Sequence, residues 1–430
     1  DESTREAIFA SPPRSFSARD DAQHVGSGLG ASLYMPGTRP QLADDVVTHH
    51  ARGLVSTVWC LEDSISESEV PAAQANIVTH LAALAARFPT PDDVAAALPL
   101  IFVRVRTPQQ LRDLATLVNE GPGGESTWSS AVLAGFVMPK FTGANAPAYF
   151  DALAEASALA GYRLLAMPVV ETPGLLHRET RGGLLAAVST VLAPHRDVVA
   201  CVRIGGTDLG AALGLRRPRE LTIYNIRPGS DVVYDIVNVF GRTDGTGFPI
   251  SGPVWEYFAN SRRLFKPQLR ETPFRALEHD DIREELLEEN LDGLVRELAL
   301  DRANGLTGKT IIHPQHVGIV HALSVVSSEE HADAVDILAK HASGGGVQAS
   351  SAESVHEVAT GEKDGNPEPS PSSTGGGSVV AGGAAPAAGA AASGLAGGCG
   401  CLRPAVLPRP APPPAARALW HQGPGRRGPR

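Results

Sequence analysis

The sequence has few residues of the kinds that cross-link a chain or anchor it in a membrane. There are 4 cysteines in 430 residues, and aromatic residues make up 5%. Cys60 and Cys201 lie inside apolar runs, whereas Cys399 and Cys401 lie in low-complexity sequence, so no disulfide framework is predicted. No apolar run reaches the roughly 18 residues that a membrane-spanning helix needs, and we expect no membrane partner.

Basic residues are also scarce. Lys and Arg total 37 against 47 Asp and Glu, which gives a net charge of −10, and the excess of acids lies before Ser343. Nucleic-acid binding needs clustered basic side chains, so we expect no nucleic-acid partner. The N-terminal residues lack the basic-then-apolar pattern of a signal peptide, and we therefore expect a cytoplasmic protein.

The composition predicts three segments. Residues 1–29 form an irregular N-terminal segment, and residues 30–342 have the mixed composition of a globular domain. From residue 343 to residue 430 the chain is rich in Gly, Ala and Pro, with stretches such as AGGAAPAAGAAASG. Such sequence cannot bury a core, and we expect a disordered tail.

Within the central segment, short apolar runs alternate with longer amphipathic stretches. The apolar runs predict strands and the amphipathic stretches predict helices. Strands are predicted over 31–37, 56–63, 98–106, 135–140, 162–171, 197–209, 248–258 and 309–314. Helices are predicted over 38–53, 67–87, 108–118, 147–160, 182–193, 281–303 and 315–327, with 210–245 resembling an insertion.

Repeated strand–helix units with nearly continuous apolar strands predict an α/β fold whose parallel sheet is buried on both faces. Eight units in roughly 280 residues favour a TIM (β/α)8 barrel, and an open doubly wound sheet is the alternative. A glycine-rich stretch, GSGLGA at 26–31, resembles a dinucleotide-binding fingerprint. It precedes the first strand instead of following it, so that interpretation is rejected.

Charged or ionisable side chains gather at the carboxyl ends of the predicted strands, where a TIM barrel carries its chemistry. Glu171 poses the sharpest question, because it ends the apolar run LLAMPVV and a buried carboxylate is costly without a partner. The strand-end residues are Arg39, Glu62, Asp63, Arg104, Arg106, Lys140, Glu171, Asp208 and His313. Gly206 and Thr207 precede Asp208, after a Gly-Gly pair that lets backbone N–H groups approach a ligand closely.

Two explanations for Glu171 stay open. Glu171 and Asp208 are predicted to end adjacent parallel strands, whose axes lie about 5 Å apart. Two such carboxylates repel, and a divalent cation such as Mg²⁺, which prefers oxygen ligands, would resolve the repulsion. Alternatively, both acids form salt bridges with Arg104, Arg106 or Lys140. His313 precedes a proline and is expected to support the site by hydrogen bonding rather than to bind a metal.

Seven motifs in order give the chain a family resemblance: LYMPGTRP, CLEDSI, FVRVR, VMPK, VVETPG, GGTDL and GKTIIHPQHV. They resemble, over about residues 30–327, the citrate lyase β-subunit and malyl-CoA lyase family of HpcH/HpaI aldolase-like enzymes. The similarity is to the TIM-barrel C–C bond lyase branch of tellurium-resistance gene clusters. The resemblance implies a lyase that cleaves or condenses a hydroxy acid, or its acyl-CoA thioester, through a keto-acid enolate.

The resemblance also implies roles for individual residues. Glu171 and Asp208 match the Mg²⁺ ligands (Mn²⁺ being an alternative), and Arg104 matches the arginine that polarises the substrate carbonyl. Glu62 and Asp63 match acids that hold metal-bound water. The remaining matches are Gly206 and Thr207 for the keto-acid carboxylate, and Arg39 for the phosphates of coenzyme A.

The sequence departs from the family in several places. Cys60 stands where Asp is common, and Arg106, a candidate substrate-binding residue, stands where Asn is frequent. The region 215–270 is longer than in citrate lyase, which puts coenzyme A use in question. In some relatives an ordered C-terminal segment covers the neighbouring subunit's site, and we expect a homo-oligomer here too.

Two alternatives to the lyase are kept. One is a phosphoenolpyruvate-type Mg²⁺ enolate enzyme, for which Arg39, Arg104 and Arg106 could accept a phosphate. The other is a non-catalytic metal- or metabolite-binding protein of a stress response. A Schiff-base aldolase is disfavoured because Lys140 ends its strand.

Overall fold

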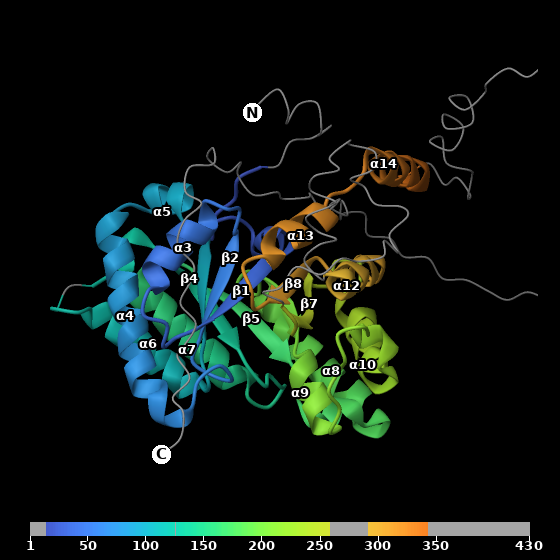
Figure 1. Ribbon diagram of the computed structural model, residues 1–430, viewed down its shortest axis with the longest axis horizontal. Coiled ribbons are helices and arrows are strands. Elements are labelled where there is room, and N and C mark those ends of the chain that lie inside the picture. Colours follow the sequence, from blue (N-terminus) through green and yellow to red (C-terminus); the bar gives the residue numbers. More distant parts are fainter. Residues whose placement is uncertain (1–13, 125, 259–290, 343–430) are drawn as a thin grey trace, which may run out of the picture. The chain divides into compact units, whose positions relative to one another are not determined.

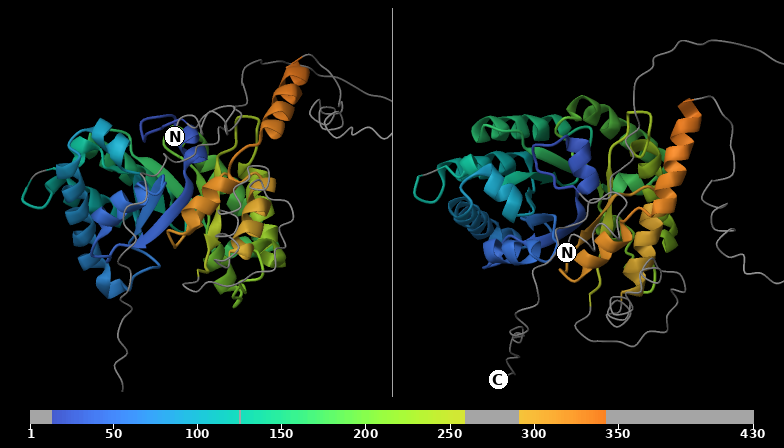
Figure 2. Two further views of the ribbon diagram at one scale, coloured as in Figure 1. Left: turned by 45° about the horizontal axis from the view of Figure 1, so that its top comes forward. Right: turned by 90° about the horizontal axis from the view of Figure 1, so that it is seen from above.

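The computed structural model describes residues 14–124, 126–258 and 291–342. Eight parallel strands close into a barrel in chain order, with the last strand pairing with the first. Helices surround these strands (Figures 1 and 2). The predicted TIM barrel is thereby confirmed, and the open doubly wound sheet is excluded. The strands are β1 Gly30–Pro36, β2 Ser56–Cys60, β3 Leu100–Arg104, β4 Leu133–Met138, β5 Leu165–Val170, β6 Val202–Ile204, β7 Ile250–Trp255 and β8 Gly308–Ile311.

Most predicted helices are present with shifted ends. The barrel unit, up to Val325, contains α2 Ala22–Gly28, α3 Leu42–His50, α4 Val70–Arg87, α5 Pro91–Ala97, α6 Pro108–Glu120, α7 Ala146–Ala160, α8 Arg178–Leu192, α9 Gly206–Ala212, α10 Arg227–Phe240, α12 Asp292–Ala303 and α13 His316–Leu323. A separate unit begins at Val326 and holds α14 Ser328–Ala342. Residues 281–290 of the predicted charged helix, and the predicted tail 343–430, lie outside the described residues.

Two layers of apolar side chains hold the barrel together. The larger layer lies between strands and helices, and it includes Leu33, Trp59 and Phe136. The smaller layer fills the barrel interior, where Phe102 and Met167 pack together. Because both faces of the strands are buried, the strands read in the sequence as continuous apolar runs rather than as alternating ones.

Helix α2 closes the amino-terminal mouth of the barrel. Its Ala22 and Val25 are fully buried in the interior layer. Gly26 allows this close approach, since a Cβ there would lie 1.7 Å from the carbonyl oxygen of Ala200. The prediction that residues 1–29 are irregular is therefore wrong for 22–28. The amino-terminal end of an eight-strand barrel is open to water unless apolar side chains cover it.

The region after β6 also differs from the prediction. The strand ends at Ile204, not at residue 209, and Gly206–Ala212 forms α9 with Asp208 in its first turn. Gly205 and Gly206 interrupt the strand, and an acid in the first turn suits the helix dipole. The predicted insertion at 210–245 contains α10, the barrel helix that follows β6. No described helix meets the length and hydropathy that crossing a bilayer requires.

Helix α13 buries an imidazole that has no hydrogen-bond partner among the described residues. His321 is 2% exposed, and both of its ring nitrogens are unpartnered. Burial lowers its pKa from 6.5 to about 4, because an apolar environment disfavours the charged imidazolium. Folding therefore holds this ring neutral.

We predict an acid-dependent loss of stability that His321 causes. Between pH 6.5 and about 4 the imidazole of His321 binds a proton in the unfolded chain but not in the folded chain. The free energy of unfolding therefore falls as pH falls through this window. The loss should approach about 3 kcal/mol and stop below pH 4. Urea denaturation of the parent and of His321→Leu across this range measures it, and the variant should lack this part of the pH dependence. His177→Leu, which removes an exposed imidazole, is the control. Parallel curves for the parent and His321→Leu would contradict the assignment.

Candidate functional site

A cavity of about 740 Å³ opens at the carboxyl ends of the strands. Every strand except β4 contributes to its lining, which includes Pro36, Cys60, Arg104, Glu171 and Gly205. The carboxyl end of a TIM barrel is where the βα loops build a site. Several of the charged residues that were predicted to gather at the strand ends thus border one cavity.

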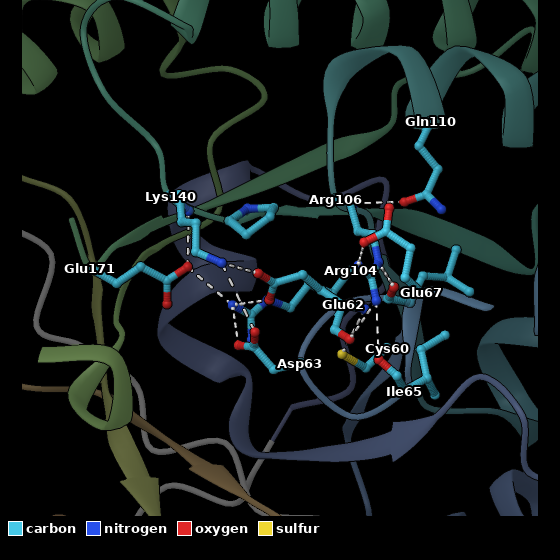
Figure 3. A network of polar contacts seen from close by, with 12 residues as sticks. Cys60, Glu62, Asp63, Ile65, Glu67, Arg104, Arg106, Gln110, Lys140 and Glu171 are labelled. Atoms are coloured by element: carbon cyan, nitrogen blue, oxygen red, sulfur yellow. Dashed lines mark hydrogen bonds and ion pairs between the residues drawn. The ribbon is translucent and has the colours of Figure 1, made fainter. Parts of the chain in front are cut away.

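Arg104 is the centre of the charge cluster. It ends β3, its side chain is 10% exposed, and a single nitrogen, Nη2, contacts three carboxylates. The distances from Nη2 are 2.5 Å to Glu62 Oε2, 3.1 Å to Asp63 Oδ2 and 3.0 Å to Glu171 Oε1 (Figure 3). The buried Nε of Arg104 has no hydrogen-bond partner among the described residues. Nη2 therefore holds the three carboxylates, whereas the Nε–H group of the same guanidinium is an unused donor.

Lys140 joins the same cluster from the β4–α7 loop. Its Nζ lies 2.5 Å from Glu62 Oε1, and its backbone N donates to Glu171 Oε1 at 2.9 Å. The backbone of Lys140 has φ +48°, a conformation that is uncommon outside glycine. This turn lets the backbone and the side chain of one residue face two different carboxylates (Figure 3). Burial raises the pKa of Glu62, and Arg104 and Lys140 oppose that rise.

Glu171 follows β5 directly and is 4% exposed. Gly205 makes room for it, because a Cβ at that position would lie 2.2 Å from Glu171 Oε2 and 2.3 Å from its Cβ. Both of its contacts, with Arg104 and Lys140, are on Oε1. Oε2 accepts no hydrogen bond from the described residues. Burial raises the pKa of Glu171 to about 7, against the opposing charge of Arg104.

The two oxygens of the buried Glu171 carboxylate thus differ in their contacts. On Oε1 the salt-bridge explanation holds, since Glu171 pairs with Arg104. On Oε2 the carboxylate still lacks a partner within the described part of the chain.

Asp208 is the second cavity carboxylate with an oxygen that lacks a donor. It is partly buried, borders the cavity, and accepts no hydrogen bond from any described residue. Burial raises its pKa, and the neighbouring charge of Asp63 adds to the rise. Among the described residues, no three His, Cys, Asp or Glu side chains come close enough to hold a metal ion by themselves. Two donor-poor carboxylates suit Mg²⁺, which is commonly held by one or two carboxylates and completes its shell with water or substrate.

The structure does not bring Arg106 into the cavity. Its Nε donates to the carbonyl of Leu61 at 2.7 Å, and its Nη2 donates to the carbonyls of Glu62 and Ile65 at 3.2 and 3.0 Å. Arg106 thus lies outside the cavity lining, and its expected contact with substrate stays a prediction. Residues two apart in a strand point to the same face of the sheet. Because β3 ends at Arg104, this alternation does not extend to Arg106. Arg106 instead fixes the loop that carries Glu62.

Arg39 also lies away from the cavity lining, where it forms an ion pair with Asp45 of α3. His313 stacks on Phe258 with ring centroids 4.9 Å apart. The Nδ1 of His313 accepts a hydrogen bond from the backbone N of Gln315 at 3.3 Å. No contact between His313 and the charge cluster is found among the described residues.

Gly206 and Thr207 do border the cavity, at the start of α9. The hydroxyl of Thr207 donates to Glu256, which comes from the segment after β7. Their expected contact with a substrate carboxylate stays a prediction.

The cavity residues that sequence reasoning missed include Arg203 of β6 and Tyr34 of β1. Arg203 is 1% exposed, and its guanidinium carbon lies 5.3 Å from the centroid of the Tyr34 ring. A signal was present, because an arginine inside the apolar run VVACVRI is unexpected unless it faces a polar interior.

A family model described as C–C bond lyase of the TIM-barrel fold matches residues 23–363. No curated protein sequence matches the chain. Among solved structures, RipC from Yersinia pestis is 14% identical, covering 71% of this chain and 99% of its own, with a TM-score of 0.41. The citrate lyase β subunit from M. tuberculosis, complexed with oxaloacetate and magnesium, is 18% identical, covering 70% and 100%, with a TM-score of 0.40. At these identities and TM-scores the similarities say nothing about substrate.

We predict that Gly205→Ala displaces Glu171. The added methyl would overlap the Glu171 side chain, and overpacking of this kind costs roughly 1–3 kcal/mol. Thermal denaturation should show a lowered melting temperature. Gly182→Ala in α8 is the matched control, since a Cβ there meets nothing within 4 Å and alanine favours the helix. Equal melting temperatures for the two variants would show that the close approach is not a constraint.

Proposed function

Because the chain belongs to the family of C–C bond lyases with the TIM-barrel fold, we propose that its cavity cleaves or forms a C–C bond of a hydroxy acid, with a 2-oxo acid as one fragment. One observation carries the proposal. Glu171 and Asp208, both short of donors, border the same cavity as a buried guanidinium with an unused N–H, that of Arg104. The first pair suits a cation, and the guanidinium suits an oxyanion.

Glu171, through Oε2, and Asp208 would hold a divalent cation, Mg²⁺ or Mn²⁺. When bound, such a cation supplies Lewis-acid stabilisation of negative charge on a substrate oxygen and orients that substrate. Its charge would also lower the pKa values that burial raises for these two carboxylates. The contacts of Oε1 with Arg104 and Lys140 would keep the Glu171 carboxylate in place for this role.

Arg104 would stabilise the enolate oxygen of the oxo-acid fragment. As the C–C bond breaks, its electron pair moves into the fragment that becomes the enolate, and the guanidinium offers fixed positive charge at that point. Groups that are oriented before the reaction stabilise developing charge most strongly in a site that excludes water. Glu62 and Lys140 would act as positioning residues, since Glu62 binds Nη2 of Arg104 and Lys140 in turn holds Glu62.

The hydroxyl proton of the substrate must leave as its carbon becomes a carbonyl. We propose Asp63 as the acceptor, because it borders the cavity and is half exposed. The second fragment would occupy the apolar side of the cavity, formed by Leu209, Leu213 and Ile223. Arg39 does not line the cavity, so coenzyme A is left out of the proposal. The tellurium-resistance link and the homo-oligomer stay predictions.

We expect the full chain to bind Mg²⁺ or Mn²⁺, as measured by isothermal titration calorimetry. Glu171→Gln and Asp208→Asn should each weaken binding at least tenfold, because each removes a charged oxygen ligand, and tenfold corresponds to about 1.4 kcal/mol. The control is Glu155→Gln, which removes an exposed carboxylate of α7 paired with Arg112.

Each titration is run with and without pyruvate, so that a cation whose shell needs a substrate oxygen is also detected. Unchanged binding in both site variants, or no binding by the parent in either condition, would overturn the metal-assisted proposal.

A further inference from the structure

The barrel interior contains a buried positive charge that the proposed chemistry does not use. Arg203 of β6 contacts neutral groups only, among the described residues. Nη1 donates to Ser32 Oγ at 3.2 Å and approaches Met167 Sδ at 3.7 Å, and Nη2 donates to Thr310 Oγ1. No described carboxylate lies within ion-pair distance of this guanidinium, although the residue is 1% exposed. A buried charge without a counter-charge is costly, so an anion is the group this position lacks.

The position is open to a ligand. Arg203, Tyr34 and Thr310 all border the cavity. The Tyr34 hydroxyl has no hydrogen-bond partner among the described residues, and its pKa is raised by burial, so it remains a donor. The charges of Arg203 and Arg104 both lower the pKa of this hydroxyl and so oppose the rise that burial causes. Tyr34 therefore lies within electrostatic reach of both guanidinium groups.

Strand register places this second charge deeper than the first cluster. Arg203 pairs with Val169 across β5 and β6, two residues before Glu171. Two residues along a strand span roughly 7 Å, one layer of inward side chains. The cavity thus has an acidic and basic rim at Arg104 and Glu171, and a positively charged floor at Arg203.

We propose that Arg203 and the Tyr34 hydroxyl bind a second carboxylate of the substrate, so that the preferred oxo-acid fragment is a short dicarboxylate. This inference rests on the proposed function, in which the 2-oxo end binds at the rim. Arg203 is then the residue that selects a dicarboxylate over a monocarboxylate. Guanidinium suits this task, because its donors match carboxylate geometry.

The test compares oxo acids of equal length that differ only in the second carboxylate. Oxaloacetate is paired with 2-oxobutanoate, and 2-oxoglutarate with 2-oxopentanoate, each titrated calorimetrically into the full chain with Mg²⁺. The parent should bind at least one dicarboxylate about tenfold or more tightly than its partner, as expected for a charged hydrogen bond. Arg203→Met should abolish that preference and leave the monocarboxylate within about threefold of its affinity for the parent.

Two further variants separate recognition from folding. Arg203→Lys keeps the charge and should retain part of the preference. Tyr34→Phe keeps the partly buried ring and should weaken only the binding of the dicarboxylate, by a few-fold. This gives a readout even if Arg203→Met does not fold.

Equal binding of both members of each pair by the parent would overturn the inference. If Glu171→Gln still abolished binding of the monocarboxylates, the proposed function would stand without it. Failure of the parent to bind any of the four acids would overturn the proposed function and this inference together.

Discussion

The contact of one guanidinium nitrogen with three carboxylates organises the carboxyl end of this barrel. Nη2 of Arg104 joins Glu62 and Asp63 after β2 to Glu171 after β5. Buried charges of this kind are costly unless each finds a partner. The contact therefore constrains three strands at once, and the rest of the site follows from it. The turn at Lys140 completes the set, because its backbone and side chain satisfy Glu171 and Glu62 separately.

Some donor and acceptor atoms of this cluster have no partner among the described residues. Arg104 restrains each acid that it contacts. Glu171 Oε2, Asp208 and the Nε of Arg104 nevertheless have no hydrogen-bond partner in the part of the chain that the structure describes. A fully satisfied buried network makes a structure rigid. The capacity that remains here is of both signs, and it borders one cavity. This is the physical content of the proposal that a cation and an oxyanion meet there.

The sequence allowed the barrel and much of the rim to be predicted, for a simple reason. Parallel strands that are buried on both faces appear as apolar runs in the sequence, and their carboxyl ends meet at one end of the barrel. Four strand-end residues could therefore be grouped from the sequence: Glu62, Arg104, Lys140 and Glu171. Arg106 was misplaced because no rule of alternation says where a strand ends. Helix α2 was missed because seven residues carry little periodicity. The depth of Arg203 could not be predicted either, since it depends on how β5 and β6 are staggered in the closed sheet.

Helix α2 has a consequence for the order of events in the cavity. Helix α2 contributes Ala22 and Val25 to the apolar layer that fills the barrel interior, so among the described residues the cavity opens at the carboxyl ends of the strands. A reaction that divides one molecule into two must then release both products through the same opening. The fragment held at the floor beside Arg203 would leave after the one nearer the rim, and in the reverse direction it would enter before it. Helix α2, at the amino-terminal end of the barrel, would in this way set the order of product release at the carboxyl end.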